Sequence, residues 1–141
     1  MRIMAIDYGD AHTGIAVSDP TGFLTGFTTV ITAYRPDRVA EQVAALAREH
    51  GAERLVLGHP INMDGTRGPR SEKAQAMKTL LEEATGLPVV LWDERRTTID
   101  AHQILMNSGK NAKKRKKVVD AVAASLILEG YLTYLKSHPE G

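Results

Sequence analysis

Three short and almost unbroken runs of apolar residues constrain the fold of this chain more than any other feature. They are Ile3–Ile6, Leu55–Leu57 and Val89–Trp92. A strand with one face in water alternates apolar and polar residues, whereas short runs without alternation are typical of strands buried on both faces. The runs therefore predict the central strands of an α/β sheet that carries helices on both faces.

Apolar residues at helical spacing occupy the segments between and after these runs. Proline at the start of the first two patterns and glycine at their ends indicate where these helices begin and stop. The four predicted helices lie between Pro36 and Gly51 and over residues 69–85, 97–107 and 116–136.

The first third of the chain has a different character. Residues 14–18 and 26–32 have the composition of strands, and glycine-rich turns too short for a helix join them to the first run. Short connections imply antiparallel pairing. We therefore expect a mixed five-stranded sheet in the order β-β-β-α-β-α-β-α-α, forming a single domain over residues 1–141.

Composition excludes several classes of protein. Hydrophobic residues make up 43% and charged residues 25% of the 141 residues, an ordinary globular balance, and no apolar stretch is long enough to span a membrane. The absence of cysteine excludes disulfide scaffolds, thiolate nucleophiles and cysteine-based zinc sites. The apolar start is too short for a secretory signal. We expect a cytoplasmic protein without a membrane partner.

Acidic residues follow two of the three apolar runs. Asp7 follows the first, and Asp93 and Glu94 follow the third. Ligands of open α/β sheets gather at the carboxyl ends of the strands, although an acid also simply ends a strand at solvent. Asp120 shares the apolar stripe of the last helix with Ala124, where a carboxylate is costly unless it is paired or binds a metal. Such a carboxylate cluster predicts one or two Mg²⁺ or Mn²⁺ ions.

Basic residues lie in the segments beside these acids. The net charge is only +1, yet six of the 18 Lys and Arg residues fall between positions 110 and 117. A charge run is often just a solvated helix face. Next to a metal-binding carboxylate cluster, however, it suggests contacts to the phosphates of a nucleic acid. The candidate phosphate-binding cations are Arg67, Arg70, Arg95, Lys113, Lys114, Arg115, Lys116 and Lys117.

Two histidines also lie near the predicted edge. His12 belongs to the glycine-rich hairpin that follows Asp7, and His59 follows the second apolar run. Either could bind a metal or act as a base, but an isolated histidine in a loop is more often polar surface.

Four segments then form a recognisable set: Ile6–Gly9 with Gly14–Asp19, Leu57–Thr66, Asp93–Arg95 and Val119–Ala124. In this order, across nearly the whole chain, the set resembles the YqgF (RuvX) family of pre-16S rRNA nucleases and Holliday junction resolvase-like proteins, within the RNase H-like superfamily. The resemblance implies that Asp7, Glu94 and Asp120 are the catalytic, metal-binding acids, and it chooses Glu94 over Asp93. It also places His12 where the family usually has a basic residue, so His12 becomes a candidate substrate contact.

We therefore expect a hydrolase: a metal-dependent endonuclease that processes the 5′ end of pre-16S rRNA during ribosome biogenesis. One alternative is a Holliday junction resolvase acting on four-way DNA by the same chemistry. A second is a nucleic-acid-binding protein without catalysis. A third is a nucleotide-binding phosphotransferase, which 141 residues would leave without a second lobe to close over the nucleotide.

Overall fold

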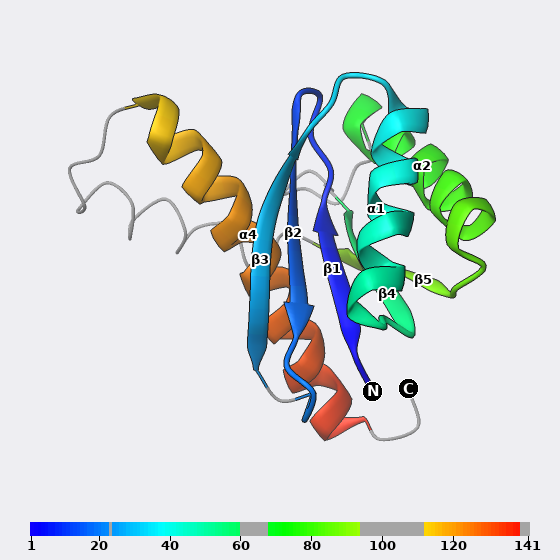
Figure 1. Ribbon diagram of the computed structural model, residues 1–141, viewed down its shortest axis with the longest axis vertical. Helices are drawn as coiled ribbons and strands as arrows, with labels where there is room; N and C mark the ends of the chain where they lie inside the picture. The colour runs from blue at the N-terminus through cyan, green and yellow to red at the C-terminus, as the bar shows by residue number, and fades with distance from the viewer. Residues whose placement is uncertain (23, 60–67, 94–111, 139–141) are drawn as a thin grey trace.

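The central strand of a mixed sheet, β1, has one antiparallel and one parallel neighbour (Figure 1). The computed structural model describes residues 1–22, 24–59, 68–93 and 112–138, without the side chains of residues 69–70 and 112–120. The strands of the described residues are β1 (Ile3–Asp7), β2 (His12–Ser18), β3 (Thr25–Thr32), β4 (Arg54–His59) and β5 (Val89–Asp93).

The strands lie in the order β3-β2-β1-β4-β5. β1 pairs with β2 and β2 with β3 in antiparallel fashion, whereas β1–β4 and β4–β5 are parallel. The tight turn between β1 and β2 permits only the antiparallel arrangement, and the parallel pairs are joined by helical crossovers. The predicted mixed five-stranded sheet is confirmed.

Three helices lie within the described residues: α1 (Pro36–His50), α2 (Pro69–Thr85) and α4 (Ala112–Ser137). The predicted limits of α1 and α2 are confirmed, because proline lies in the first turn of each and Gly51 and Gly86 end them with φ of 66° and 69°. The start of α4 predicted near residue 116 is wrong, because the described part of the helix already begins at Ala112. Lysine and arginine are good helix formers, so the basic run continues the helix toward its N-terminus. The helix predicted over 97–107 lies outside the described residues.

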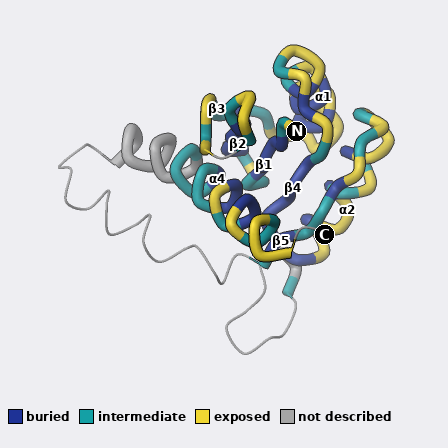
Figure 2. The backbone as a smooth tube through the Cα atoms, turned by 90° about the horizontal axis from the view of Figure 1, so that it is seen from below, coloured by how far each residue is buried: buried dark blue, intermediate teal, exposed yellow. Residues whose placement is uncertain are grey.

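Two apolar cores cover the two faces of the sheet. Figure 2 shows α1 and α2 on one side of the strands and α4 on the other, with buried residues in each layer. Met4 and Ile6 of β1 pack in the first core, with residues of α1 and α2. Ile3 and Ala5 pack in the second core, with Ala124 and its neighbours on α4. Because successive side chains of a strand point to opposite faces, these two sets fix the direction of every side chain along β1.

Candidate active site

The carboxyl ends of β1, β4 and β5 lie side by side at one edge of the sheet. Asp7 is the last residue of β1, where Ile6 is paired with Leu57 of β4. His59 ends β4 and is paired directly with Asp93, which ends β5. The predicted position of Asp7 at this edge is therefore confirmed.

The two described acids of this edge belong to opposite faces of the sheet. Asp7 continues the series of Ile3 and Ala5, whose side chains pack toward α4. Asp93 continues the series of Val89 and Leu91, which pack with the core beneath α1 and α2. Since side chains alternate along a strand, Asp93 is directed away from the α4 side, where Asp7 lies.

The other predicted acids are described incompletely or not at all. Asp120 lies in α4, one helical turn before the buried Ala124, and its side chain is not described. Glu94 lies outside the described residues. Among the side chains that are described, no three His, Asp or Glu groups come close enough to share an ion.

The predicted cations are likewise placed only by their backbone or not at all. Arg70 lies in the first turn of α2, and residues 113–117 lie in the first turns of α4, which extend beyond the β3 side of the sheet in Figure 1. Arg67 and Arg95 are outside the described residues.

His12 lies on the same face of the sheet as Asp7. It opens β2, two residues before Gly14, which is the partner of Asp7 in the ladder. Gly14 and Ala16 alternate with Ile15 and Val17 of the first core, so the even-numbered residues of β2 face α4. The Nδ1 atom of His12 is 3.3 Å from Oγ1 of Thr32, and the ring is half-buried.

The turn after Asp7 is tied to α2. Gly9 lies so close to the backbone carbonyl of His12 that a Cβ atom there would overlap its oxygen. Lys73 of α2 reaches across to Asp10, with its Nζ atom 3.0 Å from Oδ1. Burial raises the pKa of Tyr8 above the ordinary 10.0, and the Asp10 carboxylate raises it further, while Lys73 opposes both. Sequence reasoning missed Lys73, which carries no motif.

His59 is not polar surface, as an isolated loop histidine would suggest, but is buried. Its Nε2 atom lies 2.6 Å from Oγ of Ser71 in the first turn of α2. The sequence held one signal for this pair. Ser71 extends the stripe of Ala74, Met77 and Leu81 by one turn, and a polar residue in such a stripe requires a partner.

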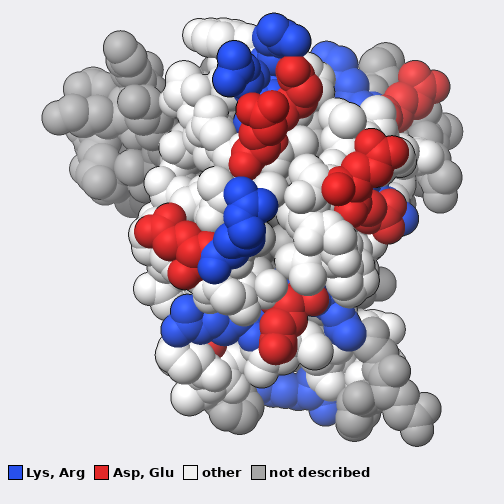
Figure 3. Space-filling model, turned by 45° about the vertical axis from the view of Figure 1, so that its right-hand side comes forward, with Lys and Arg blue, Asp and Glu red and all other residues white. Residues whose placement is uncertain are grey.

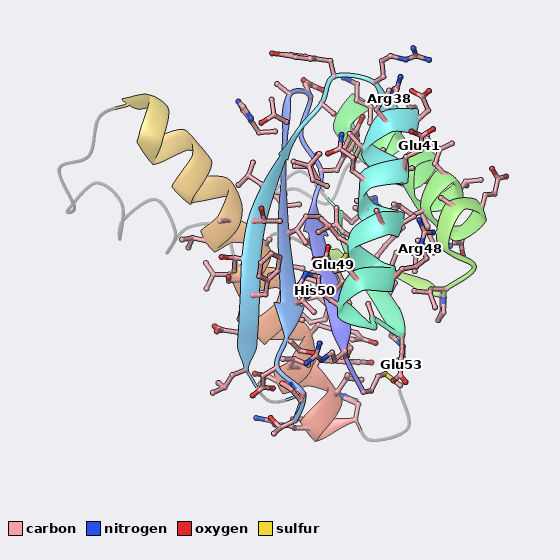
Figure 4. The ribbon with its side chains drawn as sticks, in the orientation of Figure 1. Arg38, Glu41, Arg48, Glu49, His50 and Glu53 are labelled. Carbon is pink, nitrogen blue, oxygen red and sulfur yellow. The ribbon has the colours of Figure 1, made fainter. Side chains whose placement is uncertain are left out.

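The outer face of α1 and α2 carries both signs of charge. Figure 3 shows Lys and Arg side chains next to Asp and Glu side chains on this face. Arg38 lies 3.7 Å from Glu41, and Lys78 lies 3.4 Å from Glu82. Figure 4 labels Arg38, Glu41, Arg48 and Glu49 of α1, all of which are exposed. This alternation does not form the continuous positive surface that a phosphate backbone requires.

Residues 1–134 match the family model of RuvX, which is described as a Holliday junction resolvase. The chain belongs to the RuvX family. A relative from Halothermothrix orenii is 42% identical over 134 residues, which make up 95% of this chain and 96% of that protein. Another, from Pelotomaculum thermopropionicum, is 41% identical over 133 residues, covering 94% of this chain and 86% of that protein. Both carry the name "Putative pre-16S rRNA nuclease".

Solved structures also resemble this RuvX-family chain. RuvC of Thermus thermophilus, in complex with a Holliday junction substrate, has a TM-score of 0.63 at 16% identity and covers 97% of this chain and 96% of its own. The Fowlpox virus resolvase, also bound to Holliday junction DNA, has a TM-score of 0.60 at 12% identity, with coverages of 96% and 99%. At these identities the likeness concerns the fold, and it confirms the predicted RNase H-like class.

Proposed function

We propose that this RuvX-family chain is a metal-dependent endonuclease that hydrolyses a phosphodiester bond in structured nucleic acid, with the 5′ end of pre-16S rRNA as its substrate. The observation that carries the proposal is the position of Asp7. It ends the central strand of an RNase H-like sheet, on the face that α4 covers. The names of the relatives at 41–42% identity support pre-16S rRNA as the substrate.

The donor set fits a hard divalent cation. Asp7, Glu94 and Asp120 would offer only carboxylate oxygens, the ligands that Mg²⁺ and Mn²⁺ prefer. Asp7 follows Ala5 on the face that α4 covers, and Asp120 lies one turn before Ala124 of α4; the small residues Ala5, Ala16 and Ala124 pack together between them. Three carboxylates at one place repel each other unless a cation lies between them. The opposite direction of Asp93 supports Glu94, the next residue in the sequence, as the third acid.

A divalent cation bound there would supply polarisation of the scissile phosphate and a more acidic bound water. The protein's own groups would hold and orient the substrate. His12, on the face of Asp7, would contact a phosphate near the cut. The cations of residues 113–117, on the turns of α4 that extend beyond the sheet, would contact the backbone further away. Arg67, Arg70 and Arg95 are the remaining proposed phosphate contacts.

A cleavage assay tests the proposal directly. Purified protein is incubated with the 5′ region of pre-16S rRNA, duplex DNA or a four-way DNA junction, each with Mg²⁺, with Mn²⁺ or with a chelator. We expect metal-dependent cleavage of the RNA. Preferential cutting of the junction would instead establish a resolvase, and binding to RNA without cleavage in any metal would establish a protein that only binds.

Asp7→Asn is the variant that tests the proposed metal site most directly in this assay. Asn is nearly isosteric but brings no charge to a cation, so cleavage should fall by at least a hundredfold while the fold is kept. The matched control is Asp93→Asn, which removes a carboxylate from the same edge but from the opposite face. The control should keep at least half of the wild-type rate, and equal losses in both variants would contradict the proposed site.

A further inference from the structure

A buried hydrogen bond connects the end of β4 with the start of α2. Nε2 of His59 and Oγ of Ser71 are 2.6 Å apart, and the two residues are 6% and 0% exposed. Gln75, one turn further along α2, donates from Nε2 to the same hydroxyl oxygen at 3.3 Å. Twelve positions separate His59 from Ser71, so this hydrogen bond links the end of β4 directly to the first turn of α2.

This pair cannot serve as a nucleophile and its base. A serine that attacks a substrate must be accessible to that substrate, whereas Ser71, in the first turn of α2, is fully buried. Burying an imidazole and a hydroxyl costs free energy unless they bond to each other, and apolar side chains would fill the same space without that cost. We therefore interpret the hydrogen bond between His59 and Ser71 as a contact that fixes the position of α2 relative to β4.

The contact fixes the first turns of α2 relative to the edge that carries Asp7. Ser71 lies in the first turn, directly after Arg70, and Lys73 follows two residues later. Lys73 contacts Asp10 at 3.0 Å, in the turn that begins directly after Asp7. His59 itself is the last residue of β4, the parallel neighbour of β1. The hydrogen bond therefore holds the start of α2, with Lys73, at the edge of the sheet that carries Asp7, on the face opposite to α4.

We propose that His59 and Ser71 are positioning residues for substrate binding. Their hydrogen bond keeps Lys73 where it contacts the backbone phosphates of the nucleic acid that Asp7 cuts. Neither residue touches the substrate. The inference rests on the proposed function and adds to it a substrate-binding element, the start of α2, with Lys73 as a phosphate contact.

The test measures steady-state cleavage of the pre-16S rRNA 5′ region by Ser71→Ala and His59→Leu proteins. We expect KM to rise about five- to twentyfold while kcat stays within twofold, because the chemical groups remain in place. His59→Gln should restore most of the affinity, since its amide can also hydrogen-bond the Ser71 hydroxyl. In a double-mutant cycle, Lys73→Ala should add much less to KM in the Ser71→Ala background than in the wild type.

Ser18→Ala is the matched control. Ser18 is another buried serine, whose Oγ accepts a hydrogen bond of 2.9 Å from the Ile3 N–H near the opposite end of β1. Its loss should lower stability but leave KM unchanged. If Ser71→Ala raises KM no more than Ser18→Ala does, or if the effects of Lys73→Ala and Ser71→Ala on KM simply multiply, the positioning role is overturned.

The two proposals fail separately. If the wild-type protein does not cut any substrate, the nuclease proposal fails. Equilibrium binding of the same RNA, followed by fluorescence anisotropy, then replaces KM in every comparison. A Kd raised by Ser71→Ala and restored by His59→Gln supports the positioning role in that case too, and an unchanged Kd overturns it.

Discussion

Two hydroxyl side chains of β2 are almost equally buried but differ in what they bond. Ser18, 3% exposed, accepts a hydrogen bond from Ile3, whereas the Oγ1 atom of Thr13, 0% exposed, has no hydrogen-bond partner among the described residues. A buried hydroxyl without a partner is costly, and valine has nearly the same shape as threonine. We expect Thr13→Val to raise the free energy of unfolding by about 1 kcal/mol in urea denaturation.

Ser18→Ala should lower the free energy of unfolding. It would leave the Ile3 N–H buried without its acceptor, which costs about 1–3 kcal/mol. The two variants together test whether the bonding of the hydroxyl decides its contribution. A loss of stability in Thr13→Val comparable to that in Ser18→Ala would show that both hydroxyls are bonded.

Tyr8 should make the free energy of unfolding depend on pH in the alkaline range. Burial, and then the Asp10 carboxylate, raise the pKa of Tyr8 in the folded state above the 10.0 of an ordinary tyrosine. Above that value the unfolded chain loses the phenolic proton first, so stability falls as pH rises toward the folded-state pKa. Stability curves between pH 9 and 11 should therefore fall less steeply for Tyr8→Phe than for the wild type. Identical slopes would contradict the shift.

Substitution of His12 tests whether the face of the sheet that carries Asp7 contacts phosphate. His12→Arg places a permanent cation there, and we expect it to tighten RNA binding at pH 8 by up to about tenfold, which corresponds to 1.4 kcal/mol. Binding is measured in an Asp7→Asn background, so that the RNA stays intact. His12→Gln is the uncharged control. Equal affinities of the Arg and Gln variants would exclude a phosphate contact at this position.

At the scale of the elements, the first turns of α4 carry the densest positive charge of the sequence. If they contact phosphates, binding releases counterions and weakens with salt. Replacing Lys113 and Lys114 by alanine should reduce the slope of log affinity against log salt by about one to two units. The slope is measured by anisotropy between 50 and 300 mM salt.

The control for this variant removes the same charge from the opposite side of the molecule. Arg38 and Lys78 lie on α1 and α2, each beside an acidic side chain. An alanine pair there lowers net charge equally but should leave the salt slope unchanged. Equal slopes for both double variants would mean that only the overall charge matters.

The elements themselves could largely be predicted from the sequence. Proline and glycine gave the limits of α1 and α2, because these residues act on the local backbone alone. The start of α4 was predicted wrongly, since a run of lysines is equally compatible with a solvated segment and with a helix. The apolar stripe of α2 indicates only that Ser71 needs a partner. That this partner is His59 could not be predicted, because it depends on how β4 and α2 pack.

The choice between Asp93, which ends β5, and Glu94, which follows it in the sequence, shows a related limit. The run Val89–Trp92 is apolar throughout, so its pattern does not tell which of the following residues faces which side. The family resemblance favoured Glu94, and the packing of Leu91 and Trp92 on opposite faces directs Asp93 away from Asp7. The roles of Glu94, Asp120 and the predicted cations remain predictions, which the variants above test.

At the scale of the whole molecule, one sheet separates two cores that share no side chain. Ile6 is buried in the first core and Ile127 in the second. Ile6→Val and Ile127→Val should each cost about 0.5–1.5 kcal/mol. If the chain unfolds as one domain, the costs should add in the double variant, within a single transition seen by fluorescence and circular dichroism. Two separate transitions would show that the layers unfold independently.

The mixed pairing of β1 also has a consequence for the order of folding. Its antiparallel partner is nearby in sequence, but its parallel pairing joins Ile3 with Arg54. Pairing between distant segments must overcome a larger loop-closure entropy before any contact rewards it. We therefore expect the hairpins of β1, β2 and β3 to form first. A chain emerging from the ribosome would then carry Asp7 on a finished hairpin well before β4 and β5 arrive, and the acidic edge would be completed only when folding ends.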